Sequence, residues 1–101
     1  MIYSIRVGTI KQIRKYEGLK MSKIIKGTGV RELSHIVELN NKYYFVDSND
    51  TLDVGYETMV FSCDKNGDSI DWSGLYTERY NTEEEMRESH YKVCNELENY
   101  L

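Results

Sequence analysis

The chain has 101 residues, of which 40% are apolar and 30% charged, and its formal net charge is −4. This length fits one domain over residues 1–101, and the composition favours a compact globular fold over disorder. No apolar run approaches the roughly 20 residues that a membrane span needs, and two cysteines are too few for a disulfide scaffold.

The charges are divided unevenly along the chain. Eight of the 13 lysines and arginines, but only one of the 17 acidic residues, fall within residues 1–31, so this segment carries +7 and the rest carries −11. Such segments attract each other within one chain, attract each other between two copies, or attract different partners. Their complementarity predicts a homodimer in which residues 1–20, an N-terminal extension or dimerisation arm, contribute to the interface.

The N-terminal third predicts three short elements. Residues 2–7 have the composition of a strand that ends at Gly8, and residues 9–18 have the spacing of a short helix with a capping box at its start. A second strand is expected over residues 21–26. The segment 27–29 (Gly-Thr-Gly) then forms a turn, because a single GxG without a following helix is weak evidence for phosphate binding.

A β-hairpin is the clearest local pattern. Two strand-like runs, residues 32–39 and 42–48, flank Asn40 and Asn41, and asparagine tolerates the positive φ that a two-residue hairpin turn requires. Apolar side chains occur on both faces, so the hairpin is expected to be central in the sheet. The implied register consists of four pairs: Val37 with Tyr44, His35 with Val46, Ile36 with Phe45, and Glu38 with Tyr43.

The region that follows predicts a second hairpin. Residues 47–55 are polar and are expected to form a loop, and residues 57–63 alternate as a strand that places Met59, Phe61 and Cys63 on one face. Residues 64–68 form a strong Asn-Gly turn. The strand that returns includes Ile70, Trp72, Leu75 and Tyr76, is interrupted by a bulge at Ser73–Gly74, and continues over residues 77–80, with Trp72 expected in the core.

A helix is predicted over residues 82–100. Thr82 and Glu85 form a capping box, and an apolar stripe follows at spacings of three and four residues: Met86, His90, Val93 and Leu97. The chain as a whole therefore predicts an α+β fold. It consists of a mainly antiparallel sheet of four or five strands, with the C-terminal helix packed on one face.

Several segments together carry a resemblance. They are Leu33–Leu39, Lys42–Ser48, Gly55–Phe61, Asp71–Trp72 and Tyr80–Met86 with His90. Over about residues 22–100 the chain resembles small uncharacterised proteins of phages and mobile elements in low-GC Gram-positive bacteria. The resemblance implies an accessory protein that acts in the cytoplasm of a bacterial host, but it implies no activity and transfers no functional residues.

No catalytic or metal-binding motif stands out. His35, His90, Cys63 and Cys94 are residue types that bind metals, but none is paired at close metal-binding spacing, so packed histidines are expected. Cys63 and Cys94 are expected to be small, partly buried side chains, and a disulfide is the less favoured alternative, which requires them to be neighbours in space. Ser34 and His35 are adjacent in a strand and point to opposite faces, which rules them out as a nucleophile–base pair. We therefore expect no catalytic residues, no cofactor and no metal.

The favoured function is non-catalytic binding to a host or phage protein, such as inhibition of a host defence nuclease in the manner of anti-CRISPR proteins. Acidic side chains can occupy a nuclease's cationic groove by imitating phosphates, and nine tyrosines suit an interface. The candidate partner-binding residues are Asp47, Asp50, Asp53, Glu84, Glu88 and Glu98.

The alternative function is nucleic-acid binding by the basic N-terminal segment. Lysine and arginine side chains bind phosphate backbones and release counterions, which makes such binding steeply dependent on salt. An enzyme is the least favoured of the three classes. The candidate nucleic-acid-binding residues are Lys11, Arg14, Lys15, Lys20, Lys23 and Lys26.

Overall fold

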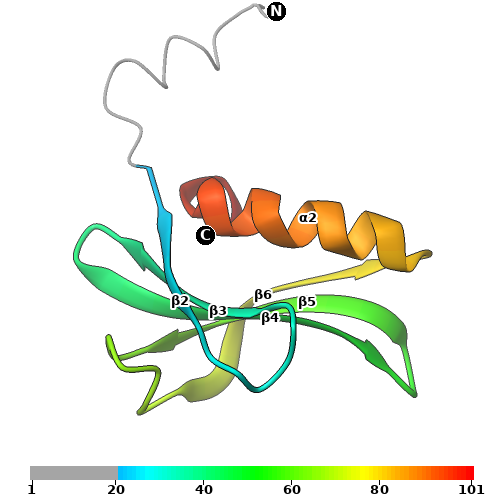
Figure 1. Cartoon of the computed structure of the whole chain (residues 1–101), viewed down its shortest axis with the longest axis horizontal. Coiled ribbons are helices and arrows are strands. Elements are labelled where there is room, and N and C mark those ends of the chain that lie inside the picture. Colours follow the sequence, from blue (N-terminus) through cyan, green and yellow to red (C-terminus); the bar gives the residue numbers. More distant parts are fainter. Residues whose placement is uncertain (1–20) are drawn as a thin grey trace, which may run out of the picture.

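In the described part of the computed structural model, an antiparallel five-stranded sheet carries one α-helix across one of its faces (Figure 1). The structure describes residues 21–101. The strands lie side by side in chain order, and the α+β fold predicted from the sequence is confirmed. The elements are β2 (Lys23–Gly27), β3 (Ser34–Leu39), β4 (Lys42–Thr51), β5 (Gly55–Cys63), β6 (Asp71–Tyr80), α2 (Glu83–Asn95) and the 3₁₀ helix η1 (Leu97–Tyr100).

The predictions for the first 20 residues cannot be compared with the structure. The expected strand over residues 2–7, the expected helix over residues 9–18 and the dimerisation arm all lie outside the described residues. The second predicted strand, over residues 21–26, is β2, which starts two residues later and ends one residue later.

The hairpin of β3 and β4 confirms its predicted turn and register. Asn40 and Asn41 both have positive φ, 56° and 63°, which matches the backbone twist of the flanking strands. All four predicted pairs are present, including His35 opposite Val46. Because β2 and β5 pair with the outer edges of this hairpin, it is central, as predicted.

The predicted loop over residues 47–55 is wrong. Strand β4 runs on to Thr51 and pairs residue by residue with β5, so only a three-residue turn, residues 52–54, separates the two strands. The turn is closed by the Thr51 hydroxyl, which donates to the Gly55 carbonyl and accepts from the Val54 amide. Polar residues can continue the strand because their backbone groups pair with β5 and their side chains form hydrogen bonds.

The β5–β6 connection has the predicted turn and bulge. Gly67 has φ 83°, and the Gly67 amide donates to the Asp64 carbonyl. The register between β5 and β6 shifts between Val60 and Ser62, and Gly74 has φ 77° at the irregular part of β6. This shift leaves residues 76–80 in regular pairing with β5, so that Tyr76 and Tyr80 face the helix side of the sheet.

Helix α2 begins where the sequence predicts and ends earlier. Thr82 and Glu85 form the expected capping box, with the Thr82 hydroxyl accepting from the Glu85 amide. The α-helical turns stop at Asn95, and the chain continues as η1 instead of the single helix predicted to residue 100. The break coincides with a buried hydroxyl: Ser22 donates to the Cys94 carbonyl at 2.6 Å and accepts from the Leu97 amide at 2.9 Å.

Helices in the described part of the chain are too short and too polar to cross a membrane.

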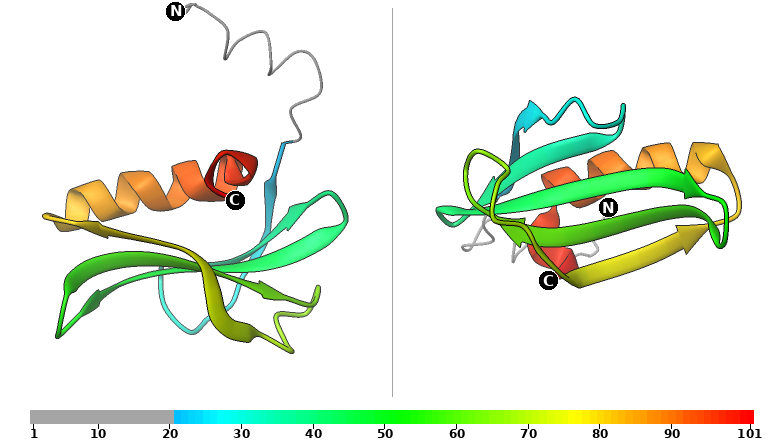
Figure 2. Two further views of the ribbon diagram at one scale, coloured as in Figure 1. Left: turned by 180° about the vertical axis from the view of Figure 1, so that it is seen from behind. Right: turned by 90° about the horizontal axis from the view of Figure 1, so that it is seen from below.

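Two apolar clusters lie on opposite faces of the sheet, and only one of them is covered by α2 (Figure 2). The predicted helical stripe of Met86, His90, Val93 and Leu97 is buried, as expected. The buried residues of the helix-side cluster are Val37, Leu39, Val46, Val60, Val93, Cys94 and Leu97. Those of the opposite cluster are Ile36, Phe45 and Phe61, with Tyr43, Met59, Cys63 and Ile70 packed against them.

Trp72 is not the core residue that the sequence predicts. Its side chain is 66% exposed, and it covers the edges of Phe45 and Phe61, with ring centroids 6.1 and 5.0 Å away. Among the described residues, the opposite cluster is not covered by a helix, and the turn at Gly67 packs closely on it, since an added Cβ there would lie 3.0 Å from Ile36.

Candidate functional site

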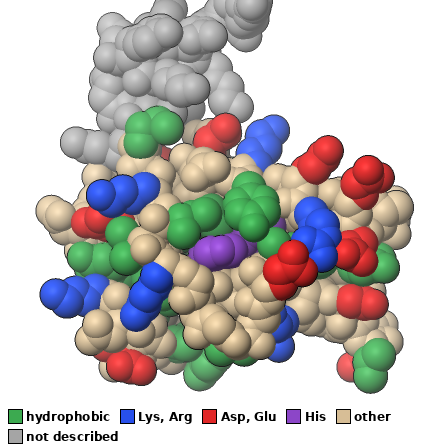
Figure 3. All heavy atoms as spheres, in the orientation of Figure 1, with side chains coloured by type: hydrophobic (Ala, Val, Ile, Leu, Met, Phe, Trp, Pro, Cys, Tyr) green, Lys and Arg blue, Asp and Glu red, His purple; other side chains and the backbone are tan. Residues whose placement is uncertain are grey.

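The six acidic residues predicted to bind a partner do not form one surface. Acidic side chains do gather at the end of the molecule where α2 begins (Figure 3). Asp50 lines a hollow there together with Glu83 and Arg87. Glu84 and Glu88 are exposed on α2, Asp53 is exposed in the β4–β5 turn, and Glu98 lies in η1 beyond the other end of α2.

Asp47 is buried in an ion pair with Arg31. It is only 8% exposed, and Arg31 binds both of its carboxylate oxygens at 2.9 Å. The same kind of pairing occurs at the start of α2, where Arg87 binds both carboxylate oxygens of Glu32 and also Glu83. The Arg87 bonds hold the pKa of Glu32 below its ordinary value. These arginines neutralise part of the acidic surface and fix the segment before β3 to α2 and β4.

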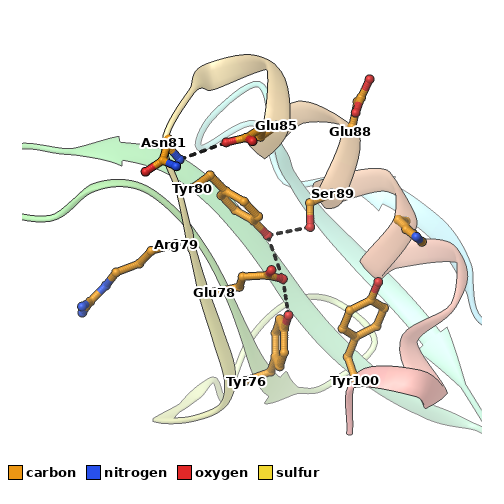
Figure 4. A pocket seen from close by; sticks show the side chains of 10 residues that line it. Tyr76, Glu78, Arg79, Tyr80, Asn81, Glu85, Glu88, Ser89 and Tyr100 are labelled. Atoms are coloured by element: carbon orange, nitrogen blue, oxygen red, sulfur yellow. Dashed lines mark hydrogen bonds between the residues drawn. The ribbon is translucent and has the colours of Figure 1, made fainter.

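A cleft of about 580 Å³ lies between β6 and the α2–η1 segment. Tyr76, Glu78 and Tyr80 alternate along β6, so their side chains share the face of the sheet that α2 covers. β6 is an edge strand, and the helix leaves this part of it partly open. Figure 4 shows Tyr100 of η1 across the cleft from Glu78.

Hydrogen bonds organise the floor of this cleft around one carboxylate. The Tyr76 hydroxyl donates to Glu78 Oε1, and the Tyr80 hydroxyl lies 3.4 Å from the same oxygen and 2.6 Å from Ser89 Oγ (Figure 4). The rings of Tyr76 and Tyr100 meet edge to face with centroids 5.2 Å apart. Half-buried Glu78 is therefore held in place by phenol groups, with aromatic faces beside it.

Burial raises the pKa of all three tyrosines above the ordinary value of 10, and the Glu78 carboxylate raises the pKa of Tyr76 further. The phenols are consequently neutral at physiological pH. Glu85 and Glu88 of α2 add two more carboxylates to the lining, and Lys92 and Arg79 supply two cations, of which Arg79 is paired with Glu57. The cleft combines excess negative charge with aromatic walls.

A buried chain of polar side chains lies behind the cleft. The Thr58 hydroxyl interacts with Tyr80 and lies 2.6 Å from Ser48 Oγ. Ser48 Oγ lies 2.7 Å from His90 Nδ1, and His90 Nε2 lies 2.8 Å from His35 Nδ1. Ser48, Thr58 and His90 are at most 2% exposed, so these contacts satisfy polar groups that burial would otherwise leave without partners.

Burial shifts the pKa values of His90, His35 and Cys94, which belong to this group of buried polar side chains or lie beside it. Burial, with a smaller effect of His35, lowers the pKa of His90 to about 4, and burial also lowers the pKa of His35. The Cys94 thiol, whose Sγ lies 3.7 Å from His90 Nε2, has its pKa raised to about 12 by burial. Both imidazoles and the thiol are uncharged at neutral pH.

The two cysteines are free and belong to different faces of the sheet. Cys94 is in the helix-side cluster, and Cys63 packs against the opposite cluster. Ser34 and His35 also diverge as predicted: the Ser34 hydroxyl hydrogen-bonds with Thr28, whereas His35 contacts His90.

Of the residues predicted to bind nucleic acid, Lys23 and Lys26 lie exposed on β2, at one edge of the sheet. Lys11, Arg14, Lys15 and Lys20 lie outside the described residues.

Comparisons with protein-family models, with curated proteins and with solved structures found no match to this chain. The assignment of function therefore depends on the geometry of the chain itself.

The sequence did not single out Glu78 or the tyrosines around it. A usable signal was present, because Tyr76, Glu78 and Tyr80 alternate within a predicted strand. The expectation that no histidine or cysteine is paired at metal-binding spacing is wrong for His90 and Cys94, which are four residues apart in the predicted helix and therefore lie on one face. Predicting that His35 lies next to His90 would require the angle at which α2 packs on the sheet, and local sequence patterns do not contain this angle.

Proposed function

We propose that this chain binds another protein and that the cleft between β6 and α2 receives a lysine or arginine side chain of that partner. The observation that carries the proposal is the placement of the Glu78 carboxylate between Tyr76 and Tyr80, with Tyr100 across the cleft. A carboxylate supplies the counter-charge for an ammonium or guanidinium group, and tyrosine faces attract the same cations through their ring quadrupoles.

Rigidity of the cleft supports this function. Tyr80 is fixed by Ser89 of α2, and Tyr76 by Glu78, so the groups that would contact the cation are already positioned. A preorganised site loses less conformational entropy on binding than one whose side chains must first be ordered. The acidic surface at the start of α2, including Glu84 and Glu88, extends the negative field toward solvent and would steer a basic partner.

A nuclease with a cationic nucleic-acid groove is the partner class that we propose to test first. Such a groove presents the arginine and lysine side chains that the cleft and its acidic surroundings would attract. This partner class is the one expected from the sequence for a phage or prophage accessory protein that inhibits a host defence nuclease. In this proposal Asp50, Asp53, Glu84 and Glu88 contribute long-range attraction, and the cleft provides the specific contact.

The test uses a fluorescein-labelled peptide of alternating lysine and glycine, with binding to the full chain followed by fluorescence polarisation. Substituting Glu78→Gln is expected to weaken binding about tenfold, equivalent to about 1.4 kcal/mol. A matched control, Asp68→Asn, removes the same charge in the exposed β5–β6 turn and should leave the affinity within about twofold.

Acetylating the peptide lysines removes their charge and should abolish binding. Equal affinities of the wild-type and Glu78→Gln proteins would contradict the role of the cleft. So would equal losses for Glu78→Gln and Asp68→Asn, since that result indicates a diffuse response to net charge.

A further inference from the structure

Three atoms that bind transition metals converge beneath α2: Nδ1 of His35, Nε2 of His90 and Sγ of Cys94. All three lie within 4.8 Å of one another. His90 and Cys94 occupy successive turns of α2, and His35 projects toward them from β3. Cys94 and His90 are fully buried, whereas His35 is partly exposed, so the cluster is connected to solvent on one side.

The separation of His90 and Cys94 is close to that of two ligands in a tetrahedral metal site. Zinc bonds of 2.0–2.1 Å to nitrogen and about 2.3 Å to sulfur place two nitrogen ligands about 3.3 Å apart and a nitrogen and a sulfur about 3.6 Å apart. The His90 Nε2 to Cys94 Sγ distance is 3.7 Å, and the two histidine nitrogens are 2.8 Å apart. To complete the geometry, the partly exposed His35 ring would have to move about 0.5 Å away from His90 Nε2, and its nitrogen, which lies within 4.8 Å of Cys94 Sγ, would have to come to about 3.6 Å from that sulfur.

The surroundings of His90 are those of a metal ligand. Its second nitrogen, Nδ1, lies 2.7 Å from Ser48 Oγ, and Ser48 in turn lies 2.6 Å from Thr58 Oγ1. When Nδ1–H donates to Ser48 and the Ser48 hydroxyl donates to Thr58, the lone pair of Nε2 points at His35 and Cys94. Hydrogen bonds of this kind fix the tautomer and the ring orientation of metal-bound histidines.

We propose that His35, His90 and Cys94 form a binding site for one Zn²⁺ ion. Two imidazoles and a thiolate suit a borderline-soft metal, whereas Ca²⁺ and Mg²⁺ require oxygen ligands. On binding, the Cys94 thiol releases its proton to solvent and the thiolate coordinates the ion. Three protein ligands leave a fourth position for water, whereas structural zinc sites are closed by four protein ligands. The role of the cleft in partner binding does not depend on this site.

The surface beside the cluster provides a route for the ion. His35 is partly exposed whereas His90 is fully buried, and Figure 3 shows histidine atoms at the surface with hydrophobic side chains beside them. The Tyr91 ring lies beside both imidazoles, with centroids 5.8 Å from His35 and 5.2 Å from His90. The fourth ligand position would therefore lie near the His35 and Tyr91 side chains.

The test titrates chelator-treated full-length protein with Zn²⁺ in competition with a chromophoric chelator, and in parallel with Co²⁺. We expect one equivalent of either metal and a thiolate-to-cobalt charge-transfer band. His35→Gln should weaken Zn²⁺ binding at least tenfold, and Cys94→Ser should remove the charge-transfer band. Cys63→Ser, which changes the other cysteine on the opposite face, should alter neither result.

Circular dichroism shows whether each variant folds, and His35→Gln, at a partly exposed position, gives a result even where Cys94→Ser does not fold. The proposal is overturned if the wild-type protein binds less than one equivalent of Zn²⁺, if His35→Gln binds as tightly as wild type, or if the Cys63→Ser variant loses the band. Two neutral histidines that share a hydrogen bond would then account for the cluster.

Discussion

Replacing Ser22 with alanine should lower the free energy of unfolding far more than removing a hydroxyl group from the protein surface would. Ser22 is 5% exposed, and its hydroxyl both donates to the Cys94 carbonyl and accepts from the Leu97 amide at the break between α2 and η1. Alanine leaves the Leu97 N–H buried without a partner, which costs about 1–3 kcal/mol. We therefore expect Ser22→Ala to lower the free energy of unfolding by about 2 kcal/mol.

Urea denaturation measures this loss directly. With a slope of about 1–3 kcal/mol per molar urea for a small domain, the midpoint should fall by about 1 M while the slope stays unchanged. Ser73→Ala is the matched control, because the Ser73 hydroxyl also makes a 2.6 Å hydrogen bond but to exposed Asp71. The control should stay within about 0.5 kcal/mol of wild type. A Ser22→Ala variant as stable as this control would refute the idea that the hydroxyl joins the start of β2 to the end of α2.

Two further predictions address the packing of α2 and the reactivity of the Cys63 thiol. Val93→Asp or Leu97→Asp places a charge without a partner in the fully buried helix-side cluster and should abolish cooperative thermal unfolding; a circular-dichroism melt unchanged by both would contradict the packing. Burial, with a smaller contribution from Asp64, raises the pKa of Cys63 from 9.0 to about 11, so less thiolate is present in the folded state at any pH below this value. At pH 8 a thiol reagent should react with Cys63, followed by mass spectrometry of the peptide that contains it, on the order of a hundredfold more slowly in the folded protein than in urea, and the folded-state rate should rise about tenfold per pH unit until pH 11. Equal rates in both states would show that the thiol is not shielded.

The sequence predicted the parts of the fold that local chemistry determines. Asn40 and Asn41 required a tight turn, and the turn fixed the register of β3 and β4. The Thr82–Glu85 capping box fixed the start of α2 in the same way. These elements depend on neighbouring residues, so a single sequence contains enough information to place them.

The errors arose where distant residues decide the structure. The polar run after Ser48 was predicted as a loop, but pairing with β5 makes it a strand. The end of α2 is set by Ser22, more than 70 residues earlier in the chain. Trp72 was expected in the core, but it lies 66% exposed beside the rings of Phe45 and Phe61.

The candidate sites were harder to predict than the fold. The sequence predicted six acidic residues as the binding site. In the structure, one of them, Asp47, forms an ion pair with Arg31, and the carboxylate in the cleft belongs to Glu78, which was not among the six. His35 and His90 were both expected to be packed histidines, and they are packed against each other. The pairing depends on how α2 crosses the sheet, which cannot be derived from either residue's immediate neighbours.

The chain-order arrangement of the strands has a consequence for the route by which the protein folds. Each strand of the sheet pairs with its neighbour in sequence, so β2 to β6 can assemble as successive hairpins with small losses of loop entropy. The bonds of Ser22 to Cys94 and Leu97 span 72 and 75 residues, and they close the longest loop among the described hydrogen bonds. We expect this closure to follow the rate-limiting step, so Ser22→Ala should accelerate unfolding and leave the folding rate nearly unchanged.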